Sequence, residues 1–136
     1  MYEVFDHTAD VGVRARAESL ELLLAEAARG LFSLIVANLD EVRPVEEETL
    51  EIAGVDPEYL LFDWLSELLF AFAVRRRLPA RFDIHLTPHG LKARVTGEAA
   101  DERRHRLEHE VKAVTYHGLR CERTEDGWAA EFILDI

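Results

Sequence analysis

The sequence predicts an α+β fold in which a mixed or antiparallel sheet is covered by two main helices. Two long segments carry apolar residues at helical spacing, several shorter segments alternate apolar with polar residues, and strands occur in pairs joined by short polar turns. Helices interleaved between such strand pairs must cover a face of the sheet. The chain has 136 residues, of which 49% are hydrophobic. Residues 1–136 are therefore expected to form a single compact domain, without room for two independent cores.

Both helices are predicted from a capping residue and the apolar stripe that follows it. Ser19 is a good N-cap for a helix over residues 20–36. Asp56 caps a second helix, with Pro57 at its first position and an expected end near Arg76. This second helix is apolar on nearly all sides, but charged residues interrupt it. We therefore expect a central core helix and not a membrane span.

The remaining periodic segments are predicted to be strands. Pro88-His89-Gly90 and Asp126-Gly127 are turn signals that join the last four strands into two hairpins. The polar segment 101–110 between these hairpins is expected to be a short helix. The predicted strands cover residues 2–6, 11–17, 44–53, 82–87, 91–95, 111–123 and 128–136.

The charge balance argues against direct, tight nucleic-acid binding. The chain has 27 acidic and 16 basic residues, for a formal net charge of −11. Nonspecific binding to RNA or DNA draws its affinity from Lys and Arg side chains that neutralise phosphates. The two richest basic runs, residues 75–77 and 103–106, are short and are interpreted as solvated surface. The acidic excess instead favours cations or a basic partner protein.

Cysteine usage and the N-terminal residues bear on location. Cys121 is the only cysteine, which excludes an intramolecular disulfide and a Cys-rich zinc site, and it is expected to be an inert, half-buried thiol in a strand. The first residues do not combine a charged region with an apolar run, so no secretory signal is predicted. We expect a cytoplasmic protein that does not associate with membranes.

The turn His7-Thr8-Ala9-Asp10 is the first candidate site. An imidazole and a carboxylate in one turn can bind a cation, and Asp is a good oxygen ligand for Ca²⁺, Mg²⁺ or Mn²⁺. The alternative is that Thr8 and Asp10 only satisfy backbone groups of the turn.

The chain end is the second candidate. Apolar strand residues continue to the last position, so a terminal strand would hold the carboxylate of Ile136 beside the side chain of Asp135. Two carboxylates fixed at one sheet edge repel each other and are stabilised by a hard cation between them. The alternative is a terminal strand with an incidental acid.

The run 111–119 is the third candidate. Strand alternation places Lys112 and Tyr116 on one face, and Thr115 and His117 on the other. A Lys and a His next to a carboxylate cluster could anchor phosphate or an acidic group of a partner. Equally, they could be ordinary exposed strand residues.

Taken together and in order, these segments resemble the archease family. The matching motifs are His7-Thr-Ala-Asp10-Val-Gly12, Leu60-Leu61-x-x-Trp64-Leu65-x-Glu67-Leu68-Leu69, Val111-Lys-Ala-Val-Thr-Tyr-His117 and the final Asp135-Ile136. The resemblance extends from residue 3 to residue 136. It implies a compact α+β fold that contains a strand-helix-strand-strand module.

The resemblance also implies a function without catalysis by the chain itself. Archeases are accessory proteins of the RtcB-type RNA ligase of tRNA splicing and RNA repair, whose guanylylation and multiple turnover they promote. By resemblance, a divalent cation (Ca, Mg or Mn) is held by Asp10, Asp135 and the carboxylate of Ile136. Lys112 is carried over as functionally important, and His7 and His117 lie in matched motifs with less defined roles.

The alternative function is a stand-alone, metal-dependent phosphoester hydrolase. In that case Asp10 and Asp135 would hold the metal, with His7 or His117 as general base. The sequence contains neither a nucleophile–base motif nor a Gly-rich phosphate loop, which favours the accessory role.

Overall fold

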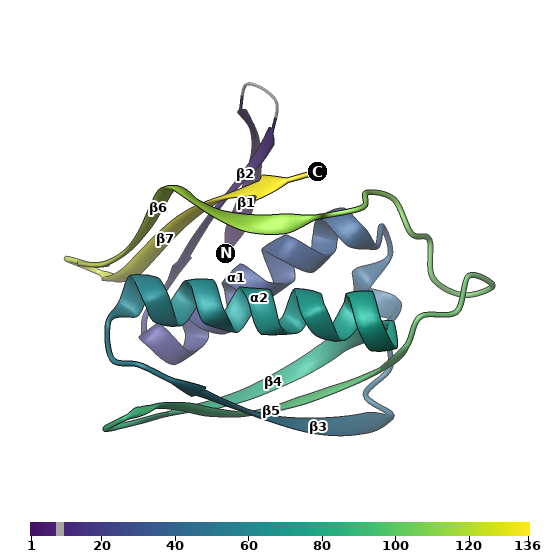
Figure 1. The fold of residues 1–136 in the computed structure, drawn as a ribbon, viewed down its shortest axis with the longest axis horizontal. Coiled ribbons are helices and arrows are strands. Elements are labelled where there is room, and N and C mark those ends of the chain that lie inside the picture. The colour runs from purple at the N-terminus through teal and green to yellow at the C-terminus, as the bar shows by residue number, and fades with distance from the viewer. Residues whose placement is uncertain (8–9) are drawn as a thin grey trace.

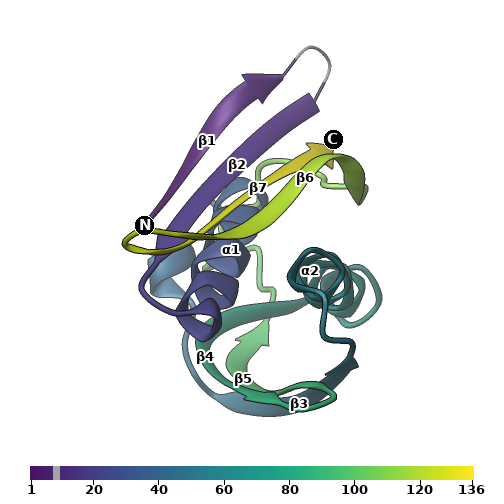
Figure 2. The ribbon, with the colours of Figure 1, turned by 90° about the vertical axis from the view of Figure 1, so that its left-hand side faces the viewer.

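A layer of two helices lies between two antiparallel sheets in the computed structural model, which describes residues 1–7 and 10–136. Figures 1 and 2 show this arrangement, with one sheet above the helices and one below. The upper sheet has the strand order β1 (Tyr2–His7), β2 (Asp10–Ala17), β7 (Gly127–Asp135) and β6 (Ala113–Thr124). The lower sheet has the order β3 (Glu46–Ala53), β5 (Gly90–Ala99) and β4 (Arg77–Thr87).

The two helices begin at the predicted caps. In α1 (Leu20–Ile35), the Ser19 hydroxyl accepts a hydrogen bond from the Leu22 amide, at 3.2 Å. In α2 (Pro57–Arg75), the Asp56 carboxylate accepts one from the Glu58 amide, at 2.9 Å. Each side chain satisfies an amide that has no partner within its helix.

The core lies where the helices face each other and the sheets. Trp64 of α2 is fully buried, and its indole N–H donates to the carbonyl oxygen of Leu24 in α1 at 2.9 Å. Its ring also packs edge-to-face on Phe82 of β4, with centroids 5.9 Å apart. One side chain thus links both helices to the lower sheet.

The α+β class, the two covering helices and the strand-helix-strand-strand module are confirmed, the module being β3–α2–β4–β5. The strands, however, divide between two sheets, one on each side of the helices. The apolar character of α2 on nearly all sides is consistent with this arrangement, because such a helix needs more than one covering layer.

The predicted helix over residues 101–110 is wrong. This segment consists of a turn and extended backbone. It has no apolar stripe that could bury a helical face. It is held instead by polar contacts: Arg106 donates its amide to the Asn38 side chain at 2.8 Å, and the Asn38 amide group donates to the carbonyl oxygen of Arg104 at 2.8 Å.

Candidate functional site

The ends of β2, β7 and β6 meet at one edge of the upper sheet. Val11 of β2 pairs with Leu134 of β7, so the next step of this register places Asp10 opposite Asp135. Residues directly opposite each other in an antiparallel pair have Cβ atoms about 5 Å apart. The register therefore brings together two carboxylates that lie far apart in the sequence.

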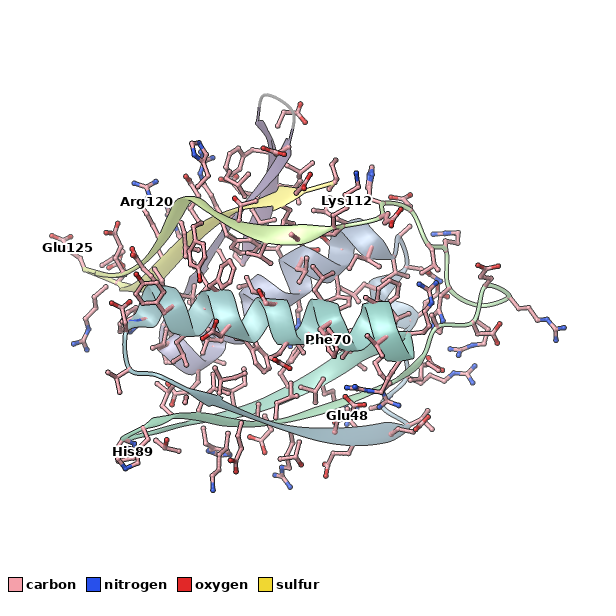
Figure 3. All side chains as sticks on the ribbon, viewed as in Figure 1. Glu48, Phe70, His89, Lys112, Arg120 and Glu125 are labelled. Carbon is pink, nitrogen blue, oxygen red and sulfur yellow. The ribbon has the colours of Figure 1, made fainter. Side chains whose placement is uncertain are left out.

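The neighbouring strand adds Lys112 to this edge. Asp135 pairs with Ala113 of β6, and the backbone amide of Lys112 donates to the carbonyl oxygen of Asp135 at 2.7 Å. Figure 3 shows Lys112 beside the end of β7. Lys112 and Ile136 are both exposed. We call Asp10, Lys112, Asp135 and Ile136 the acidic edge.

The two aspartates lie on the same, outer face of the sheet. Arg14 of β2 and Glu131 of β7 are paired and form an ion pair on that face, with Nε and Oε1 2.7 Å apart. Asp10 and Asp135 are each four residues from this pair, and residues at even spacing in a strand point to the same side. Asp10 is half-buried and Asp135 is exposed.

His117 is exposed, but the alternation that predicted its face does not hold. Thr115 pairs with Ile133, and the next pair is Arg120 with Glu131. Residues 116–119 of β6 therefore oppose a single residue of β7, which is a β-bulge larger than the usual two-against-one type. Gly118 in this bulge has φ 66°, a left-handed conformation that favours glycine.

The structure describes only part of the turn His7-Thr8-Ala9-Asp10. His7 is the last residue of β1 and pairs with Asp10, while Thr8 and Ala9 lie outside the described residues. Within residues 1–7 and 10–136, no group of three or more His, Cys, Asp or Glu side chains is arranged to hold a metal ion. The acidic edge offers two carboxylate side chains, and a third carboxylate would have to come from the main chain at Ile136.

The donor chemistry of the acidic edge fits a hard divalent cation. Carboxylate oxygens are the ligands that Ca²⁺, Mg²⁺ and Mn²⁺ prefer. The side chain of Thr115, beside Ala113 on the same strand, has a buried Oγ1 without a hydrogen-bond partner in the described part of the chain. Buried polar atoms are normally satisfied, so this oxygen is a further polar group near the edge that a ligand or water could satisfy.

Sequence reasoning missed a buried polar network at the other end of the 101–110 segment. His105 is 1% exposed, its Nδ1 accepts a hydrogen bond from the Asp101 amide at 2.9 Å, and its Nε2 lies 3.1 Å from Glu98. Arg104 forms an ion pair with the same carboxylate, and the Arg43 amide donates to it at 2.7 Å. The Arg104 hydrogen bond is the main cause that lowers the pKa of Glu98 to about 2.

The network corrects the interpretation of residues 103–106 as solvated surface. Arg104 and His105 are tied to Glu98, which also accepts from the Arg43 amide, and no sequence signal reveals this because Glu98 and Arg43 lie outside the segment 101–110. The other basic run, residues 75–77, also takes part in ion pairs. Arg77 is paired with Glu46 at 2.9 Å.

Cys121 has the inert role predicted for it, but it is buried and not half-buried. It is 5% exposed in β6, and burial raises the pKa of its thiol to about 12. A thiol that stays protonated is a poor nucleophile and a poor metal ligand. It therefore takes no part in the candidate site.

The fold and the edge define a class: small α+β proteins with a helical layer between two antiparallel sheets and carboxylates at one sheet edge. Residues 2–136 match the Archease protein family (MTH1598/TM1083). Proteins named archease from Methanopyrus kandleri and Pyrococcus abyssi are 41% and 37% identical over 139 and 140 residues. These alignments cover 99% of this chain and 99% and 98% of the relatives. The chain belongs to the archease family.

Solved structures agree with this assignment. The solution structure of Methanobacterium thermoautotrophicum protein 1598 is 33% identical and superposes with a TM-score of 0.82, covering 99% of this chain and 98% of that one. The crystal structure of a Thermotoga maritima archease, described as a possible chaperone, is 23% identical with a TM-score of 0.66 over 100% of this chain and 98% of that one. At that identity it shows the shared fold alone.

No helix in the described part of the chain combines the length and apolar character that a transmembrane helix needs.

Proposed function

We propose that this protein is a non-enzymatic accessory factor that binds a divalent cation and activates an RtcB-type RNA ligase in tRNA splicing and RNA repair. The observation that carries the proposal is the convergence of Asp10 of β2, Asp135 of β7 and Lys112, which directly precedes β6, at one edge of the upper sheet. Membership of the archease family supports it. The description of the Thermotoga maritima relative as a possible chaperone is compatible with a role exerted on a partner protein.

Asp10, Asp135 and the carboxylate of Ile136 would hold the cation, which is Ca, Mg or Mn. Once bound, such a cation neutralises phosphate charge and orients the groups of a nucleotidyl transfer. The chain's own contribution is to fix the carboxylates: the Lys112 amide holds the carbonyl group of Asp135, and pairing with β7 holds the start of β2. His7 and His117 are proposed to contact the partner.

Charge supports a partner protein over direct RNA binding. A ligase active site that holds RNA and GTP must neutralise phosphates, so its surroundings carry positive charge. An acidic edge on a chain of net charge −11 complements such a site and is attracted to it. Complementary charge also raises the rate of encounter.

The proposal is tested by titrating the protein into its cognate ligase and measuring ligase guanylylation with GTP. We expect the rate to rise at substoichiometric amounts, and no ligation by the protein alone. An unchanged guanylylation rate across the titration would refute the function while leaving the fold intact. Phosphoester hydrolysis by the protein alone that is lost in Asp10→Ala would instead support the hydrolase alternative.

A further inference from the structure

The side of α2 that faces away from α1 carries large apolar side chains that are exposed. Tyr59, Phe70 and Val74 are 59%, 56% and 60% exposed. Their spacings of eleven and four residues are close to whole helical turns, so they form one row about 22 Å long. In Figure 2, α2 lies at the border of the helical layer, and Figure 3 shows Phe70 on its outward side.

An aromatic side chain from β6 extends this row. Tyr116 is 58% exposed and stacks on Phe62, with ring centroids 3.9 Å apart and an interplanar angle of 11°. It also contacts Tyr59 edge-to-face, with centroids 6.2 Å apart. Tyr116 lies at the start of the β-bulge, where β6 leaves its register with β7. We call Tyr59, Phe62, Phe70, Val74 and Tyr116 the α2 flank.

Mainly acidic charges accompany these apolar side chains on the helix. Glu58, Asp63 and Glu67 are exposed on this helix, and its one basic residue is Arg75 at the last position, which pairs with Glu48 of β3 at 3.3 Å. Exposed apolar patches on soluble proteins mark interaction sites, and Tyr and Phe are enriched at the centres of interfaces. The surface that complements this one therefore combines apolar side chains with Lys or Arg.

We propose that the α2 flank is the docking surface for a basic, apolar surface of a partner protein. The identity of this partner rests on the proposed function, which makes it the RNA ligase. A second copy of this chain is disfavoured, because two facing flanks would bring six carboxylates together at one interface. The same carboxylates repel a phosphate backbone.

The α2 flank and the acidic edge are two surfaces connected by β6, and we assign a different role to each. β6 packs on α2 and pairs with β7, so it connects Tyr116 of the flank to Lys112 and Asp135 of the edge. One partner can thus contact both surfaces. The flank would supply affinity, whereas the edge would act on the ligase active site.

Isothermal titration of the full chain into the ligase tests this division, together with guanylylation at saturating protein. Tyr59→Ser and Phe70→Ser should each raise the Kd about tenfold, as expected for aromatic anchors, and leave the saturated rate unchanged. Leu22→Ser on α1, where Leu22 is 55% exposed, is the matched control and should leave the Kd unchanged. Asp63→Lys should also weaken binding, and Glu125→Lys at the distant β6–β7 turn should not.

Each outcome decides the proposal. Raised Kd values confined to the flank variants support it. Tight binding of the wild type that Tyr59→Ser, Phe70→Ser and Asp63→Lys all leave unchanged overturns the docking surface, while the proposed function stands. A wild-type dimer in sedimentation that Phe70→Ser dissociates assigns the flank to a second copy and overturns the proposal. A wild type that does not bind the ligase overturns both the proposed function and this occupant.

Discussion

The backbone amide of Lys112 donates a 2.7 Å hydrogen bond to the carbonyl oxygen of Asp135, and this bond ties the start of one strand to the end of another. It fixes the main chain at Asp135, which carries one of the two carboxylate side chains of the acidic edge. Because the main chain sets the position of this side chain, removing the carboxylate should alter the chemistry of the edge without disturbing its geometry.

Asp10→Ala and Asp135→Ala should therefore abolish ligase activation while the protein remains folded. Both residues lie at strand ends and outside the hydrophobic core. Divalent metal should stabilise the wild type by a free energy of RT ln(1 + [L]/Kd) and should not stabilise the variants. In calorimetry this appears as a melting temperature that rises with added metal for the wild type alone. Arg103→Ala, in the segment 101–110, is a control that should respond to metal like the wild type. Equal metal stabilisation of wild type and both variants would place the cation elsewhere.

A C-terminal tag should impair metal binding and activation more than an N-terminal tag. Extending the chain beyond Ile136 converts its carboxylate into a neutral peptide carbonyl, a weaker ligand for a hard cation. The fold should survive, because Phe132, Ile133 and Leu134 stay buried. A tag before Met1 removes an exposed ion pair between the α-amino group and Glu26, which contributes little. Ligase assays of the two tagged forms decide the matter: full activity with the C-terminal tag would exclude Ile136 as a ligand.

Much of the fold could be predicted because its signals are local. Ser19, Asp56 and Pro57 mark helix starts through hydrogen bonds within one turn, and Gly127, with φ 147°, marks the last hairpin through a conformation that favours glycine. The start of β4 at Arg77, five residues before its predicted start, was hidden by Pro79. A proline argues against a strand, but it is tolerated here because β4 is an edge strand with a register shift beyond Pro79.

The candidate site was harder to predict because it depends on distant pairings. That Asp10 and Asp135 share a face follows from the β2–β7 register, which no local pattern contains. Alternation failed at His117 because a bulge changes the count of residues along β6. The burial of His105 is accompanied by a contact with Glu98 of β5, outside the segment 101–110, so a polar segment looked like solvated surface.

The stability of the protein should depend on pH through Glu98. Its pKa is lowered to about 2 from a reference value of 4.5, so its contribution to folding is complete above pH 4.5 and is lost as the pH falls toward 2. Glu98→Gln should reduce the free energy of unfolding at pH 7 by about 2 kcal/mol, as expected for hydrogen bonds to a buried charged group.

Urea unfolding at pH 7 and near pH 3 measures this contribution. The difference between wild type and Glu98→Gln should shrink at the lower pH, where the wild-type carboxylate is largely protonated in the unfolded chain but still ionised in the folded one. Glu102→Gln, at an exposed position of the segment 101–110, should have the same free energy of unfolding as the wild type at both pH values. A constant difference across this range would mean that Glu98 does not stabilise the fold through its charge.

The isolated protein should not bind RNA measurably at physiological salt. The net charge is −11, Arg77 and Arg104 are engaged with Glu46 and Glu98, and phosphate binding requires free cations. A gel-shift assay with a tRNA exon substrate checks this expectation. Tight, salt-sensitive binding would reveal a basic face, and Arg75→Ala or Arg81→Ala would show whether residues 75–81 form it.

We expect this protein to allow its ligase to turn over more than once. The direct measurement is the number of RNA joining events per ligase molecule, with the protein present in catalytic amounts and with GTP and divalent metal supplied. We expect many events per ligase with the wild-type protein, and the level of the ligase alone with Asp135→Ala. If wild type and Asp135→Ala give the same number of events, the acidic edge does not activate the ligase, and the proposed function is wrong.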